Sequence, residues 1–127
     1  MVAVIGSRSV RGKLAAGQLA AHLAQLRPAL VVSGGATGAD ELAAAWARAN
    51  GVPLLELRPD YRAHGAGATH ERNRAIAARA DVVVLLWDGA STGTLSTARA
   101  AARLGRPCHW LLHGPPAAEP VPGGLGL

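Results

Sequence analysis

Residues 31–40 read VVSGGATGAD, and this stretch decides how the rest of the chain is organised. A short apolar run ends in the turn SGG, and an alanine-rich helical pattern opens with TGAD. The stretch thus combines a strand, a glycine turn and the N-terminus of a helix. Such an arrangement brings backbone N–H groups and the positive end of the helix dipole to one place, which favours binding of an anion. A tight strand-to-helix turn explains the glycines equally well. The stretch therefore predicts a βα unit, with an anion site as the functional alternative.

Similar units recur along the chain. The hydrophobic spacing predicts strands at residues 2–5, 30–33, 52–57, 82–87 and 107–112, and helices at 10–26, 40–50, 69–80 and 95–104. Alternating strands and helices favour a parallel sheet with helices on both faces. The fourth run is the most apolar, so it should be a central strand beside the first. We therefore predict an α/β fold: a three-layer, doubly wound, Rossmann-like sheet of five parallel strands in the order 3-2-1-4-5.

Length and composition limit the partners. A chain of 127 residues fits one domain, taken here as residues 1–113, followed by a Pro- and Gly-rich tail at 114–127. The net charge of +5 points to anionic partners, unless it reflects a drift in composition towards Arg and Ala. The single cysteine, Cys108, excludes an internal disulfide and fits a reducing compartment. No apolar stretch approaches the roughly 20 residues of a membrane span. We expect a cytoplasmic protein with no membrane partner.

The glycine-bearing turns point to a ligand site. In doubly wound sheets, ligands bind beyond the carboxyl ends of the strands, near the point where the strand order reverses. The turns after the first, second and fourth strands meet at that point, and they read GSRS, SGGATGAD and DGASTGT. We expect these turns to form a phosphate-binding crevice. The candidate ligand-binding residues in them are Gly6, Ser7, Arg8, Ser33, Gly34, Gly35, Gly38, Asp40, Asp88, Ser91, Thr92, Gly93 and Thr94.

Some of these residues also have a structural explanation. Arg8 can grip a phosphate with two hydrogen bonds or lie in solvent, and its position at the reversal point favours the ligand role. Asp40 either binds ribose hydroxyls or forms a capping box with Thr37. The hydroxyl groups at 91–94 can cap a helix and bind a phosphate with the same geometry. The chain has no GxGxxG motif, which argues against an ordinary dinucleotide-dependent dehydrogenase.

The longest irregular stretch is expected at residues 58–68. A loop of this length in a compact domain is often functional. Asp60, His64 and His70 lie in it or beside it, but their spacing matches no familiar metal site. We therefore expect neither a metal nor a cofactor.

The helix that follows opens with ERNR, in which helical phase separates two arginines. Ile76 is the only large apolar residue of this helix, so its face should point at the sheet. Arg72 lies four residues earlier, near the same face, whereas Arg74 lies two residues earlier and points away. We therefore expect Arg74 to meet solvent. Arg72 should reach the crevice, or else brace the fold by pairing with an acid such as Asp40 or Asp88.

Taken together, these motifs resemble the SLOG superfamily, which contains the LOG phosphoribohydrolases, the DNA-processing protein DprA and small nucleotide-binding domains. The chain is most similar to the YspA-like branch, whose pattern resembles GSR, SGGAxGAD, RN and a late GT turn. Here these motifs fall at residues 6–8, 33–40, 72–73 and 93–94, and the resemblance spans about residues 2–112. It implies a nucleotide-derived ligand, either ADP-ribose- or NAD-related or a nucleoside phosphate, and it adds Arg72 and Asn73 to the ligand-binding residues. We also expect a homo-oligomer.

Two alternative functions follow from the same resemblance. LOG enzymes carry a HERK-like stretch and a PGGxGTxxE motif that ends in a catalytic glutamate, but this chain has HERN at 70–73 and Thr97 in the place of that glutamate. An N-glycosidic phosphoribohydrolase would have to use Glu71 instead, together with Arg72, so the resemblance leaves enzymatic activity open. The third alternative is DprA-like binding of single-stranded DNA. The basic charge favours it, and the scarcity of aromatic stacking platforms argues against it.

Overall fold

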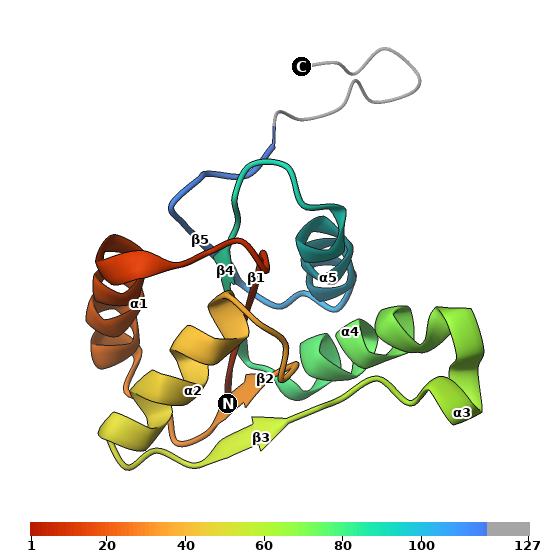
Figure 1. Ribbon diagram of the computed structural model, residues 1–127, viewed down its shortest axis with the longest axis horizontal. Coiled ribbons are helices and arrows are strands. Elements are labelled where there is room, and N and C mark those ends of the chain that lie inside the picture. Colours follow the sequence, from red (N-terminus) through yellow and green to blue (C-terminus); the bar gives the residue numbers. More distant parts are fainter. Residues whose placement is uncertain (117–127) are drawn as a thin grey trace.

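Five parallel strands form the central sheet, in the order β3-β2-β1-β4-β5 (Figure 1). The structure is a computed structural model, and it describes residues 1–116. The strands are β1 Val2–Gly6, β2 Val31–Ser33, β3 Leu54–Glu56, β4 Val82–Leu86 and β5 Cys108–Leu111. This arrangement confirms the predicted doubly wound α/β fold and its strand order.

The centre of the sheet is the pair β1 and β4, which are in register from Val2 opposite Val82 to Gly6 opposite Leu86. Residues 83–86 of β4 have no exposed surface. A strand that is covered on both faces needs apolar side chains at every position, not at alternate ones. The apolar run therefore predicted the central strand correctly.

Helices cover both faces of the sheet (Figure 1). The helices α1 Gly12–Leu26 and α2 Ala39–Ala49 enclose one core with the side chains of β1 and β4, in which Leu19 and Leu23 are fully buried. The helices α4 Ala68–Arg79 and α5 Thr92–Arg103 enclose the other core, around Ile76 and Ala101. Alanine supplies much of both cores, so the helices pack closely on the sheet. The carboxyl ends of the strands lie between these two layers.

Some of the predicted boundaries were wrong. The stretch expected to be irregular at 58–68 contains α3 Tyr61–His64 and the 3₁₀ turn η1 Gly65–Gly67, because the Asp60 carboxylate accepts a hydrogen bond from the Ala63 N–H at 3.1 Å and caps a short turn. The helix α5 begins at Thr92 rather than 95, since the polar residues expected to precede it form its first turn. The strands β3 and β5 are shorter than the predicted runs.

Most of the predicted tail, residues 117–127, lies outside the described residues, so the division at 113 stays a prediction. None of the helices in the described part of the chain is long and apolar enough to span a membrane.

Candidate functional site

A cavity of about 440 Å³ lies at the carboxyl edge of the sheet, and we call it the edge cavity. It is bordered by the turns after β1, β2 and β4 and by the helices α4 and α5. Its lining residues are Ile5, Gly6, Arg8, Ser9, Gly34, Ala36, Asp40, Thr69, Arg72, Asn73, Ile76, Asp88, Ser91, Gly93, Thr94 and Thr97. The three glycine-bearing turns thus meet at one cavity.

Most of the candidate residues from the sequence line this cavity, but some do not. Those that line it are Gly6, Arg8, Gly34, Asp40, Arg72, Asn73, Asp88, Ser91, Gly93 and Thr94. Those that lie outside it are Ser7, Ser33, Gly35, Gly38, Glu71 and Thr92. Lining residues that sequence reasoning missed are Ile5, Ser9, Ala36, Thr69, Ile76 and Thr97. Among these, Ser9 belongs to the GSRS turn and Ile76 sets the inward face of α4, so both had a signal in the sequence.

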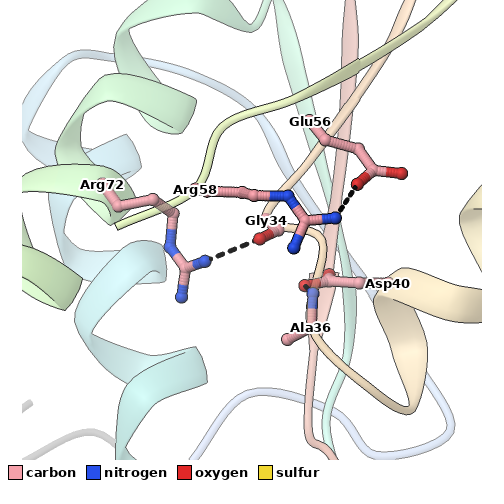
Figure 2. Close-up of polar contacts among 6 residues, drawn as sticks. All are labelled: Gly34, Ala36, Asp40, Glu56, Arg58 and Arg72. Carbon is pink, nitrogen blue, oxygen red and sulfur yellow. Dashed lines mark hydrogen bonds and ion pairs between the residues drawn. The ribbon is translucent and has the colours of Figure 1, made fainter. Parts of the chain in front are cut away.

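Arg72 reaches from α4 to the turn between β2 and α2 (Figure 2). Its Nη1 donates a hydrogen bond to the Gly34 carbonyl at 2.9 Å, and its Nε donates one to Asn73 Oδ1 at 2.9 Å. Arg74 lies on the exposed side of the helix, where it pairs with Glu71 at 3.2 Å. The two arginines therefore point as their helical phase predicts.

The alternative bracing role of Arg72 has no ion pair to support it. Among the described residues, neither Asp40 nor Asp88 forms a salt bridge with Arg72. The guanidinium contacts a backbone carbonyl instead, so its positive charge faces the edge cavity without a carboxylate bound to it.

Burial dominates the electrostatics of this corner of the cavity. Desolvation raises the pKa of Asp40, and it outweighs the opposing hydrogen bond from Ala36 and the positive charge of Arg72. Desolvation also lowers the pKa of Arg72, and the charge of Arg8 lowers it further against the attraction of Asp40. Both shifts have the same cause. Burial removes water from each charged group, and this loss outweighs the attraction between the two opposite charges. An anion bound here would stabilise the two guanidinium groups.

The start of α2 differs from the predicted capping box of Thr37 and Asp40. Gly38 is the N-cap residue, and its N–H donates to the Glu41 carboxylate at 3.2 Å. The Asp40 carboxylate instead accepts a hydrogen bond from the Ala36 N–H at 3.0 Å (Figure 2). The prediction was wrong because Gly38, with φ 73° and ψ −122°, turns the chain one residue later than Thr37 would. Asp40 therefore shapes the turn that borders the cavity.

Asp88 joins two of the turns. Its Oδ1 accepts hydrogen bonds from the N–H groups of Ala90 and Ser91 at 2.9 and 2.8 Å, and its Oδ2 accepts one from Ser9 Oγ at 2.8 Å. These bonds, the two backbone bonds first, lower the pKa of Asp88. Its own N–H donates to the buried Ser7 Oγ at 3.0 Å. Ser7 and Asp88 thus hold the β1 and β4 turns together, with Asp88 at the cavity wall and Ser7 behind it.

The second glycine turn also has a side that faces away from the cavity. Gly35 adopts φ 69°, and a side chain there would meet Glu56 and Arg58. Arg58, which sequence reasoning missed, pairs with Glu56 at 3.0 Å and lies against this turn (Figure 2). The pairing of β2 with β3 places Ser33 opposite Glu56 and so brings Arg58 near. The Ser33 Oγ is buried and has no hydrogen-bond partner among the described residues.

The carboxylate considered for hydrolysis is not among those that line the cavity. Glu71 lies outside it and pairs with Arg74. Thr97 lies at the cavity wall, where its Oγ1 donates to the Gly93 carbonyl at 3.4 Å. Within the described chain, the carboxylates that line the cavity belong to Asp40 and Asp88.

Two of the polar residues considered for a metal site make separate contacts. Asp60 caps α3, and His70 Nδ1 shares a hydrogen bond of 3.0 Å with Ser96 Oγ of α5. No three His, Cys, Asp or Glu side chains between residues 1 and 116 are placed to share a metal ion.

Comparison with protein families and solved structures gives the following matches. The sequence profile of the family described as "YspA, cpYpsA-related SLOG family" matches residues 1–64, the half of the chain that holds the first two glycine turns. No curated protein matches the sequence.

Several solved structures are similar. DNA processing protein A from Streptococcus pneumoniae aligns with a TM-score of 0.72 and 23% identity over 89% of this chain and 50% of that one. The protein of the same name from Helicobacter pylori, whose structure concerns its single-stranded DNA binding mode, gives 0.69 and 26% over 89% and 65%. The protein TM1055 gives 0.64 and 25% over 84% and 71%. This chain thus spans half of the first protein and 65% of the second, and the first similarity shows the fold alone.

Proposed function

Because the chain belongs to the YspA, cpYpsA-related SLOG family, we propose that it binds a nucleotide or nucleotide-derived ligand in the edge cavity. The observation that carries this proposal is a single cavity bordered by three glycine turns and by the guanidinium groups of Arg8 and Arg72. Its volume of about 440 Å³ lies within the roughly 300–1,000 Å³ of small-molecule sites. The ligand is a nucleoside phosphate or an ADP-ribose- or NAD-related molecule. A cytoplasmic location and self-association stay predictions.

The cavity offers separate contacts to the parts of such a ligand. The first turn of α5 has no side-chain cap, so backbone N–H groups near Gly93 are available to a phosphate. Arg8 and Arg72 supply the positive charge, and the Asp40 carboxylate is an acceptor for ribose hydroxyl groups. Ile5 adds an apolar side chain to the wall of the edge cavity. These contacts support the proposed class of ligand.

Replacing Arg8 by alanine should weaken binding of ADP-ribose by about 1.5–3 kcal/mol, the scale of a hydrogen bond to a charged group. Titration calorimetry measures this change. Arg11→Ala is the matched control, because Arg11 is an exposed arginine close in the chain that does not line the edge cavity. Unchanged affinity in Arg8→Ala would show that Arg8 does not contribute to ligand binding.

Hydrolysis of the LOG kind should be absent, because Glu71 lies outside the cavity and Thr97 cannot act as an acid or base near neutral pH. Incubation with AMP followed by chromatography should show no free adenine above the rate of a chain-free control. Rapid release of the base that Glu71→Gln abolishes would contradict this expectation and make the chain an enzyme.

Binding of single-stranded DNA is the other candidate, favoured by the similarity to DNA processing protein A and by the net charge of +5. The placement of the four aromatic side chains argues against binding of single-stranded DNA. Trp87 is buried, whereas Trp46 and Trp110 are half-buried and pack against the two cores. The rings of Trp87 and Trp110 lie 5.7 Å apart. Tyr61 is exposed but does not line the edge cavity. Single-strand binding proteins stack bases on exposed aromatic rings, so a small nucleotide suits this cavity better.

A further inference from the structure

A second cavity, of about 520 Å³, lies between α4 and α5, and we call it the helix groove. Its walls are one stripe of each helix. On α5 the residues Thr92, Ser96, Arg99 and Arg103 recur at intervals of four, three and four, which places them on one face. On α4 the facing residues are Thr69, His70 and Asn73.

The helix groove continues the edge cavity. Thr69, Asn73 and Gly93 line both of them, so the two share a wall at the start of α5. A side chain at residue 93 would meet no heavy atom within 4 Å, so the glycine faces open space at this junction. The hydrogen bond between His70 Nδ1 and Ser96 Oγ, at 3.0 Å, joins the two helices across the groove.

The lining of the groove selects for an anion. Its charged residues are Arg99 and Arg103, and no Asp or Glu of the described chain lines it. The other polar side chains are hydroxyl, amide and imidazole groups, which can donate hydrogen bonds. The edge cavity, in contrast, also contains the carboxylates of Asp40 and Asp88. The groove is therefore the more favourable place for additional negative charge.

We propose that the helix groove binds the second phosphate, with its attached sugar, of a pyrophosphate-linked ligand whose first phosphate lies at Gly93. This inference rests on the proposed function, because the nucleoside half of the ligand occupies the edge cavity. It narrows the ligand class from nucleoside monophosphates to molecules such as ADP-ribose, in which two phosphates follow one another. The second phosphate then lies against the hydroxyl groups of Thr92 and Ser96, and the sugar beyond it extends along α5 toward Arg103.

A single DNA strand also offers consecutive phosphates, but a strand needs surfaces for its bases along the path. None of the four aromatic side chains of the chain lines the helix groove. The groove offers donors for a charged group and no platform for stacking, so a soluble pyrophosphate fits it better than a strand does.

Titration calorimetry with AMP and ADP-ribose on three chains tests this proposal. They are the wild type, Arg103→Ala and the matched control Arg48→Ala. Arg103 and Arg48 are each the basic residue in the last turn of their helix, so the two substitutions remove the same charge and the same helix-end interaction. Only Arg103 lines the groove, since Arg48 lies on α2, on the opposite face of the sheet.

The wild type should bind ADP-ribose at least about tenfold more tightly than AMP, an advantage of about 1.4 kcal/mol. Arg103→Ala should lose at least half of this advantage in free energy, without a change in AMP affinity, and Arg48→Ala should retain all of it. Equal affinities of the wild type for the two nucleotides, or an unchanged advantage in Arg103→Ala, would contradict ligand binding in the helix groove and leave nucleotide binding in the edge cavity standing. Failure of both nucleotides to bind would overturn the proposed function as well. Binding of an oligothymidylate that needs Arg103, with no advantage for ADP-ribose, would assign the groove to nucleic acid instead.

Discussion

Replacing Arg72 by alanine is expected to weaken ADP-ribose binding by about 100-fold, close to 3 kcal/mol, the upper end for a hydrogen bond to a charged group. Two effects add. The cavity loses a guanidinium that faces the ligand, and the Gly34 carbonyl loses its hydrogen bond from Nη1 at 2.9 Å. The buried Asp40 carboxylate also loses the positive charge that partly offsets its desolvation. A negative charge left without this partner repels an anionic ligand.

Arg74→Ala is the matched control, because it removes the same side chain two positions along the same helix. Its guanidinium pairs with Glu71 on the exposed side of α4, so its loss should change affinity by less than about twofold. Calorimetry gives the affinity of each variant and thermal unfolding gives its stability. A lower melting temperature in Arg72→Ala with affinity preserved would show that Arg72 only braces the fold. Equal losses of affinity in the two variants would show that the helix face does not matter.

The second large effect is expected at Gly38. Its φ of 73° and ψ of −122° lie in a region that glycine alone occupies readily. A Cβ at this position would also lie 2.5 Å from the carbonyl oxygens of both Ser7 and Arg8, which belong to the backbone of the β1 turn. Strain of about 1–2 kcal/mol from the left-handed conformation and about 1–3 kcal/mol from the overlap add up. Gly38→Ala should therefore destabilise the fold by about 2–5 kcal/mol, the sum of these two ranges.

Gly51→Ala separates strain from overlap. Gly51 has a similar φ of 65°, but a Cβ there would meet no atom within 4 Å. Its replacement should cost only the conformational strain, about 1–2 kcal/mol. Urea unfolding of the two variants measures the difference. Equal destabilisation by both would mean that the β1 and β2 turns do not approach as closely at Gly38 as the structure shows.

The sequence predicted the fold well because the signals for it are periodic and repeated. Five apolar runs alternate with helical patterns, and the run that forms β4 is apolar at every position, so both the fold class and the strand order followed. The turn α3 escaped prediction because it is one short element that depends on a single cap by Asp60. A pattern of four residues carries too little periodicity to reveal a helix.

The candidate site was predictable only in part. Glycine turns and the phase of α4 located the edge cavity and the inward side of Arg72. Residue type could not show which polar groups bond to a neighbouring turn. The Ser7 hydroxyl accepts a hydrogen bond from the Asp88 N–H and lies outside the cavity that it was expected to line. The helix groove had no signal, because it arises only where α4 packs against α5 and His70 meets Ser96, 26 residues further along the chain.

The most direct test of nucleotide binding at the edge cavity is a titration of the ¹⁵N-labelled chain with ADP-ribose, followed by NMR. The backbone amides of Gly6, Gly34 and Gly93 come from three different turns and line one cavity. All three should shift together along one saturable curve, while the amide of Gly51, at the far end of α2, should stay in place. The absence of saturable shifts at the three glycines, or saturable shifts confined to other elements, would contradict the account.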